Sequence, residues 1–211
     1  MKARKVVTRS GRKLRGYFPS VKLGRMVEWE SLLERDAILL MEFSPGVKSF
    51  REQPELIQYR DGDVVRRYFP DFEITTTDAE LIHLEVKPEK QLLRADVVHK
   101  LTKVAEHYAA KRHAYRILTD KVIRRQPLLG NVTLLARIRR PADTLLSLSA
   151  EVRYLLTDGP LPFDDLAHRV GRERLLKMIA LGHVGCDLTA PLSGTTPVIH
   201  PREINHDQVL F

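Results

Sequence analysis

The stretch YFPDFEITTTDAELIHLEVKP, residues 68–88, predicts two short β-strands joined by a polar turn. Side chains two residues apart on a strand point to the same face of a sheet. With the turn centred near Asp78, Asp71 on the first strand lies opposite Glu85 on the second. Two like charges in that position repel each other by roughly 3–4 kcal/mol at an effective dielectric of about 20. The pair therefore needs a compensating charge.

A divalent cation between the two carboxylates would convert this repulsion into attraction. Lys87 follows Glu85 by two residues, so it lies on the same strand face. Two carboxylates beside a lysine suit Mg²⁺, which takes oxygen ligands, keeps several waters and also binds substrate phosphates. The stretch therefore predicts a Mg²⁺ site, in which we expect Mn²⁺ to substitute.

The charge of the whole chain favours a polyanionic partner. The 211 residues have a net charge of +8 at pH 7, which indicates nucleic acid before membrane. The single cysteine, Cys186, excludes an internal disulfide and a zinc site built from cysteines. No apolar stretch has the length of a signal-peptide core or a membrane span. We expect a soluble, cytoplasmic protein that associates with the nucleoid when it binds DNA.

Residues 1–27 are rich in lysine and arginine and contain no acid. We interpret them as a basic N-terminal arm that neutralises DNA phosphates, with a solvated tail as the alternative. A second basic face is expected on the helix that follows Pro88. The residues predicted to bind DNA are Arg4, Lys5, Arg12, Lys13, Arg15, Lys22, Lys100 and Lys103.

A helix and a broken strand precede the hairpin. Apolar side chains recur at three- and four-residue spacing over Glu28–Phe43, and Ser44-Pro45-Gly46 ends this helix. Residues 47–59 predict a strand that is interrupted at Gln53-Pro54, because proline cannot donate to a strand ladder. A turn at Asp61-Gly62 then predicts another hairpin.

A β-α-β unit is expected after the hairpin. Residues 92–112 predict a helix with Leu93 and Tyr108 in its inward stripe, and residues 115–119 predict a short apolar strand. This strand should lie parallel to the second hairpin strand, because such crossovers join parallel strands. A further helix is expected at 126–140.

The segment after Pro141-Ala142-Asp143 predicts a second, smaller domain. Residues 145–156, 162–170 and 172–181 predict three short helices, and residues 183–200 a β-hairpin. Three helices followed by a hairpin are the outline of a winged helix, a relative of the helix-turn-helix. Such a domain either reads DNA or docks proteins, and both roles stay open. The expected organisation is a basic arm at 1–27, a core domain at 28–141 and a winged-helix-like domain at 142–211.

The acids and the lysine form one candidate catalytic site. An acid after a proline, followed one hairpin later by Glu-x-Lys, resembles the restriction-endonuclease-like nucleases, which have an α/β core with a mixed sheet flanked by helices. Carboxylate-bound Mg²⁺ would make a water nucleophilic and stabilise the leaving 3′ oxygen. Lys87 would orient that water or balance charge at phosphorus. The expected catalytic residues are Glu34, Asp71, Glu85 and Lys87, with Asp71, Glu85 and Glu34 as metal ligands; a surface ion pair is the alternative.

The flanking residues resemble one family. LLERDAILLMEFSPGVKSFREQPEL, YFPDFEI, LEVKP and ILTDKVI, within residues 25–125, look like the TnsA family, the endonuclease subunits of heteromeric transposases in Tn-seven-like elements. The resemblance implies that Glu34, Asp71, Glu85 and Lys87 are the active-site set. It also implies cleavage at the 5′ ends of a transposon, beside a DDE transposase subunit (TnsB-like) and a regulatory AAA+ ATPase (TnsC-like). In the prototypical member a glutamine stands at the position of Glu85, which bears on the number of metal ions.

Three functions are open at this point. The first is a Mg²⁺-dependent endonuclease that cuts double-stranded DNA at transposon ends together with those partners. The second is a stand-alone restriction, repair or phage-type nuclease, which would cut DNA without a partner. The third is a non-enzymatic DNA-binding adaptor built on the basic arm and the winged helix. That adaptor would bind no metal at Asp71 and Glu85.

Overall fold

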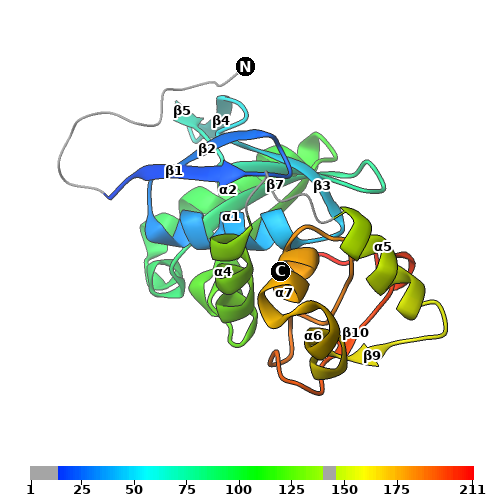
Figure 1. The fold of residues 1–211 in the computed structure, drawn as a ribbon. Helices are drawn as coiled ribbons and strands as arrows, with labels where there is room; N and C mark the ends of the chain where they lie inside the picture. The colour runs from blue at the N-terminus through cyan, green and yellow to red at the C-terminus, as the bar shows by residue number, and fades with distance from the viewer. Residues whose placement is uncertain (1–13, 140–145) are drawn as a thin grey trace. The chain divides into compact units, whose positions relative to one another are not determined.

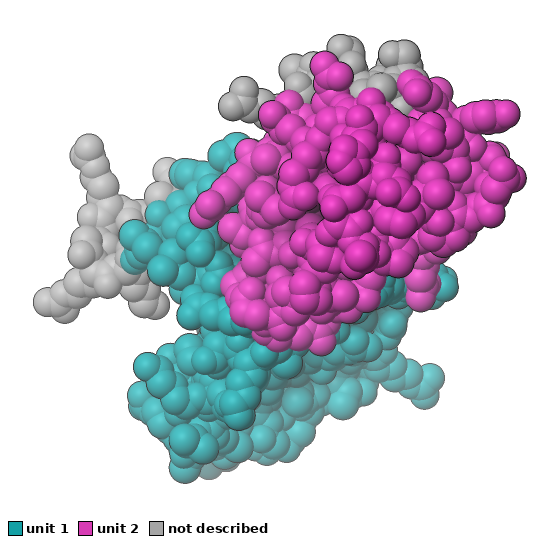
Figure 2. Space-filling view, turned by 60° about the horizontal axis from the view of Figure 1, so that its bottom comes forward, with its two compact units in different colours: residues 1–124, 207–211 teal, residues 125–206 magenta. Residues whose placement is uncertain are grey.

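The computed structural model describes residues 14–139 and 146–211. The chain forms two compact units, coloured separately in Figure 2, which are residues 1–124 with 207–211, and residues 125–206. The domain limits expected from the sequence divide the chain differently and stay a prediction. No helix among the described residues is long and apolar enough to cross a membrane.

The first unit is built on a four-stranded mixed sheet in the order β3-β6-β7-β8. Two of these strands, β3 and β7, are labelled in Figure 1. β3 (Val47–Glu52), β6 (Phe72–Thr76) and β7 (Leu81–Lys87) are antiparallel neighbours. β8 (Ala114–Thr119) lies parallel to β7, which confirms the predicted β-α-β unit. In the register between β6 and β7, Phe72 pairs with Leu84 and Glu73 pairs with His83. This register places Asp71 opposite Glu85, as the sequence predicted.

Helices flank this sheet. α1 (Leu32–Phe43) contacts β3 and β7, and α2 (Ala95–Ala110) contacts β8. A 3-10 helix, η1 (Glu89–Leu93), precedes α2, and the short helix α3 (Asp120–Ile123) follows β8. A mixed sheet flanked by helices fits a restriction-endonuclease-like core, so the predicted fold class of this part of the chain is confirmed at that level.

α1 begins at Leu32 rather than at Glu28, because Arg25–Trp29 form a strand instead of the predicted first helical turn. Ser31 caps the helix, since its Oγ accepts a hydrogen bond from the Glu34 N–H at 3.1 Å. Glu34 reaches back in turn, and its Oε2 accepts from the Glu30 N–H at 2.7 Å. This pair is a variant of the S-x-x-E capping box, because Glu34 accepts from the residue before the N-cap rather than from the N-cap itself. Most of the helix is buried, including Leu33, Ala37, Ile38, Leu39, Leu40 and Met41.

A hairpin lies where the sequence predicted part of a basic arm. β1 (Gly16–Ser20) pairs with β2 (Arg25–Trp29). The buried carboxylate of Glu42 on α1 holds its turn, accepting hydrogen bonds from Ser20 Oγ at 2.6 Å and from two backbone N–H groups at 2.8 and 2.9 Å. Lys22 Nζ donates to three backbone carbonyls around the end of α1, at 2.6–2.8 Å. These long-range contacts attach the segment to the core.

A further hairpin covers α2. β4 (Ile57–Asp61) pairs with β5 (Val64–Tyr68) around Gly62, whose positive φ of 61° suits the predicted tight turn. Leu93, predicted to face inward on the helix, is 85 % exposed because it belongs to η1 rather than to α2. The hairpin and α2 share one buried cluster, formed by Ile57, Tyr59, Tyr68, Val104 and Tyr108.

The second unit is mainly helical. The helices at 145–156, 162–170 and 172–181 are confirmed, with ends shifted by one residue or so. The predicted hairpin at 183–200 is reduced to one bridge between Gly185 and Ile199. The winged-helix interpretation of this unit therefore stays a prediction. Its elements are α4 (Leu128–Ile138), α5 (Leu146–Leu155), β9 (Leu161–Pro162), α6 (Phe163–Val170), α7 (Arg172–Ala180), β10 (Pro197–Val198), which pairs with β9, and η2 (Pro201–Glu203).

Residues 207–211 belong to the first unit. The Gly46 N–H donates to the Gln208 carbonyl at 2.7 Å, and the Leu210 N–H donates to Ser44 Oγ at 3.0 Å. A Cβ at Gly46 would lie 2.6 Å from the Asp207 carbonyl oxygen, so only glycine permits this close approach. The end of α1 and the end of the chain are thus packed together.

Candidate active site

The charged side chains of the central hairpin meet where β6 begins and β7 ends. Lys87 Nζ lies 2.5 Å from Glu85 Oε1 and 3.7 Å from Asp71 Oδ2. The Val86 N–H donates to Asp71 Oδ2 at 2.8 Å and so fixes the carboxylate. The structure brings Asp71, Glu85 and Lys87 together, which follows from the register and from the two-residue period of a strand.

The site is largely shielded from water. The side chain of Glu85 is 1 % exposed, whereas those of Asp71 and Lys87 are 19 % and 22 % exposed. Burial, and next the charge of Glu85, hold the pKa of Asp71 well above its ordinary value. Burial alone would lower the pKa of Lys87, but the carboxylates of Asp71 and Glu85 raise it above its ordinary value. Lys87 is therefore an ammonium at neutral pH.

Glu34 lies close enough to Asp71 and Lys87 to interact with both electrostatically. Burial raises its pKa, while hydrogen bonds from the Glu30 backbone and the Ser31 side chain act in the opposite direction. These hydrogen bonds are 2.7 and 2.9 Å long, and each uses one carboxylate oxygen. The cap of α1 thus holds Glu34 beside the site, and its role as a third metal ligand stays a prediction.

The carboxylates of the site are few for a protein metal site. Across residues 14–139 and 146–211, no group of three or more histidine, cysteine, aspartate or glutamate side chains is arranged to hold a metal ion. Mg²⁺, however, keeps several waters and is commonly bound through one or two carboxylates. With both carboxylates ionised, Asp71 and Glu85 carry two negative charges against the one positive charge of Lys87, so the net charge of the three groups is −1. These two carboxylates fit a hydrated divalent cation.

Tyr68 touches Glu85 and is a site residue that the sequence analysis missed. Its hydroxyl donates to Glu85 Oε2, and the residue is 8 % exposed. Burial, and then the Glu85 charge, raise the pKa of Tyr68, so it stays protonated and acts as a donor. The available signal was an aromatic hydroxyl at the end of the strand that leads into Pro70-Asp71. Tyr68 fixes the second oxygen of Glu85.

The residues predicted to bind DNA fall into separate places. Arg15 and Lys22 have partners within the first unit, and Lys103 Nζ donates to Glu106 at 2.8 Å. Lys100 Nζ lies 5.0 Å from the centre of the Tyr68 ring, which places it beside the site. DNA contacts by these residues stay a prediction. Outside the described residues lie Arg4, Lys5, Arg12 and Lys13.

The mixed sheet flanked by helices fits a restriction-endonuclease-like core, and Asp71, Glu85 and Lys87 lie together on it. Residues 44–120 match the family model for the TnsA-like endonuclease N terminal. This part of the chain is therefore similar to the TnsA-like endonucleases, and the match supports a nuclease. It includes Asp71, Glu85 and Lys87 but neither Glu34 nor the second unit. No curated protein matches the chain.

Asp71→Asn should stabilise the metal-free protein at neutral pH. Because folding raises the pKa of Asp71, the folded state binds more protons than the unfolded state between the ordinary value of 3.8 and the raised one. Stability therefore falls as pH rises through that window, and the variant lacks this loss. Melting curves in EDTA should show a Tm above that of the wild type by a few degrees at pH 7 and an equal Tm at low pH.

Asp78→Asn is the matched control, since Asp78 is exposed in the turn of the same hairpin. It should leave the melting temperature unchanged at both pH values. A lower Tm for Asp71→Asn at pH 7 would show that the buried carboxylate is fully compensated without a cation.

Tyr68→Phe should weaken Mn²⁺ binding about 10- to 100-fold, the usual effect of removing a partner of a metal ligand. Without the hydroxyl, Glu85 Oε2 loses its donor and the carboxylate can rotate toward Lys87. Calorimetric titration with Mn²⁺ measures the change. Tyr59→Phe is the control because Tyr59 lies in the same buried cluster. Equal affinities for the two variants would exclude a positioning role for Tyr68.

Proposed function

We propose that the protein is a Mg²⁺-dependent endonuclease that hydrolyses phosphodiester bonds of double-stranded DNA at the 5′ ends of a transposon. The observation that carries this proposal is the meeting of Asp71, Glu85 and Lys87 at one hairpin end within a TnsA-like domain. As partners we propose a DDE transposase subunit and an AAA+ ATPase, which the TnsA-like character of the domain supports.

The two carboxylates form the proposed metal-binding part of the site. A Mg²⁺ ion held by Asp71 and Glu85 would lower the pKa of a water and neutralise charge on the phosphate. The protein fixes both carboxylates beforehand, through the Val86 N–H on Asp71 and the Tyr68 hydroxyl on Glu85. Groups that are already oriented need no rearrangement as charge develops in the transition state.

Lys87 supplies the positive charge of the protein at the reacting phosphate. An ammonium has three donors, and Glu85 Oε1 and the Val86 carbonyl accept two of them, at 2.5 and 3.3 Å. The third can reach the attacking water or a non-bridging phosphate oxygen. Because the neighbouring carboxylates raise the pKa of Lys87, the charge is present throughout the reaction.

Lys87→Ala should reduce Mg²⁺-dependent cleavage of the 5′ strand by at least about 100-fold, as expected when one preorganised donor to the transition state is lost. The assay uses transposon-end DNA with the partner proteins present. Lys90→Ala is the control, because Lys90 is an exposed lysine three residues away on η1. Circular dichroism and Mn²⁺ titration should show that both variants keep the fold and the metal site.

The same assay separates the other functions. Cleavage by the purified protein with Mg²⁺ alone would favour a stand-alone nuclease. Full activity of Lys87→Ala would remove this lysine from the mechanism. A protein that binds DNA but never cuts, and tolerates replacement of both Asp71 and Glu85, would be an adaptor rather than an enzyme.

A further inference from the structure

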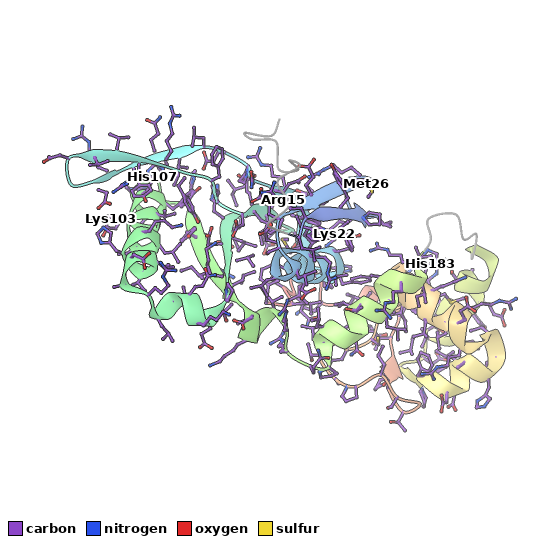
Figure 3. All side chains as sticks on the ribbon, turned by 90° about the vertical axis from the view of Figure 1, so that its left-hand side faces the viewer. Arg15, Lys22, Met26, Lys103, His107 and His183 are labelled. Atoms are coloured by element: carbon purple, nitrogen blue, oxygen red, sulfur yellow. The ribbon has the colours of Figure 1, made fainter. Side chains whose placement is uncertain are left out.

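The β4–β5 hairpin has one face that packs inside the protein and one that does not. Its inner face belongs to the cluster with α2, through Ile57, Tyr59 and Tyr68. Figure 3 shows the hairpin extending over α2, where Lys103 and His107 are labelled. Because side chains alternate along a strand, every second residue of each strand points away from this cluster. This outer face of the hairpin consists of Gln58, Arg60, Val65 and Arg67, all exposed.

The outer face carries positive charge without nearby compensation. Neither Arg60 nor Arg67 forms an ion pair or a side-chain hydrogen bond with any residue in the described ranges. Arg66, on the inner face opposite Tyr59, differs, since its Nε lies 3.5 Å from Asp61 Oδ2. Two free guanidinium groups on one ribbon face are suited to phosphate, which arginine binds through parallel N–H donors.

The base of the hairpin is fixed at the candidate active site. β5 ends at Tyr68, whose hydroxyl donates to Glu85, and Asp71 follows three residues later. Arg67 directly precedes Tyr68. In the strand register Arg67 lies opposite Gln58, so Arg60 is its diagonal neighbour, about 7–8 Å away across the ribbon. The two arginines thus lie side by side on one face of the ribbon, and Arg67 is at its end nearer the site.

We propose that the outer face of the β4–β5 hairpin binds the phosphate backbone of DNA beside the scissile bond, with Arg60 and Arg67 each contacting one phosphate. This inference rests on the proposed nuclease function. A two-stranded ribbon is an element that fits against a DNA groove. Phosphate contacts fix position and carry no sequence information, so the face sets where the duplex lies rather than which sequence is cut.

The test is DNA binding by the full-length variant Arg60→Gln/Arg67→Gln over a range of salt concentrations. Each phosphate contact contributes about 0.9 to the slope of log K against log salt concentration, so the slope should fall by about 2. The loss should be equal for unrelated DNA sequences. Mn²⁺ binding at Asp71 and Glu85 should not change, because neither arginine touches that site.

Two further variants keep the test decisive. Arg66→Gln should retain the wild-type salt slope, since Arg66 is on the other face and pairs with Asp61. Arg60→Lys/Arg67→Lys keeps the charges and should retain most of the slope even if the glutamine variant folds poorly.

The outcomes distinguish this inference from the proposed function. If the wild type cuts DNA with Mg²⁺ and the partner proteins present, but the glutamine variant keeps its slope and affinity, the arginines are merely solvated and the inference fails alone. If the wild type neither binds nor cuts DNA, the nuclease proposal fails and this inference fails with it. A wild type that cuts and a glutamine variant with the reduced slope support both.

Discussion

Asp71 and Glu85 face each other across the β6–β7 hairpin, where they are largely shielded from water. The surrounding residues are arranged so that they offset the repulsion between the two carboxylates. Lys87 lies against both, while Val86 and Tyr68 each hold one carboxylate by a hydrogen bond. The repulsion nevertheless persists as a raised pKa of Asp71. The proposed cation would compensate this repulsion, and its binding would recover the stability that the metal-free site lacks.

The same face of the sheet carries a second buried polar group, centred on His83. His83 is opposite Glu73 in the register, and its Nε2 lies 3.3 Å from both Glu73 Oε2 and Glu55 Oε1. Its ring stacks on Tyr108 of α2 at 4.2 Å, while Arg51 holds Glu73 through two hydrogen bonds of 2.6 and 2.9 Å. Buried polar groups that find partners specify one arrangement of strands and helix. That arrangement fixes where Glu85, two residues along β7, points.

Local patterns predicted the hairpin, its register and the parallel β8, because strand alternation, turn residues and crossover geometry act over short distances. The strands at residues 16–20 and 25–29, which replace the end of the expected arm and the first residues of the expected helix, could not be predicted in this way. They depend on Glu42 and on carbonyls about 20 residues away, which local charge does not reveal. The S-x-x-E pattern that begins at Ser31 indicates a helix cap for Glu34. A glutamate at this position also fits an active-site acid, so the sequence alone does not separate the two roles. Tyr68 was missed since its partner, Glu85, is 17 residues away.

We propose that Asp71 and Glu85 jointly hold a divalent cation. Crystals of the wild type and of Asp71→Asn, soaked in Mn²⁺ and measured at a wavelength where manganese scatters anomalously, test it directly. We expect an anomalous peak between the two carboxylates in the wild type and its loss in the variant. A wild-type map with no peak there, or with manganese bound only elsewhere, would contradict it.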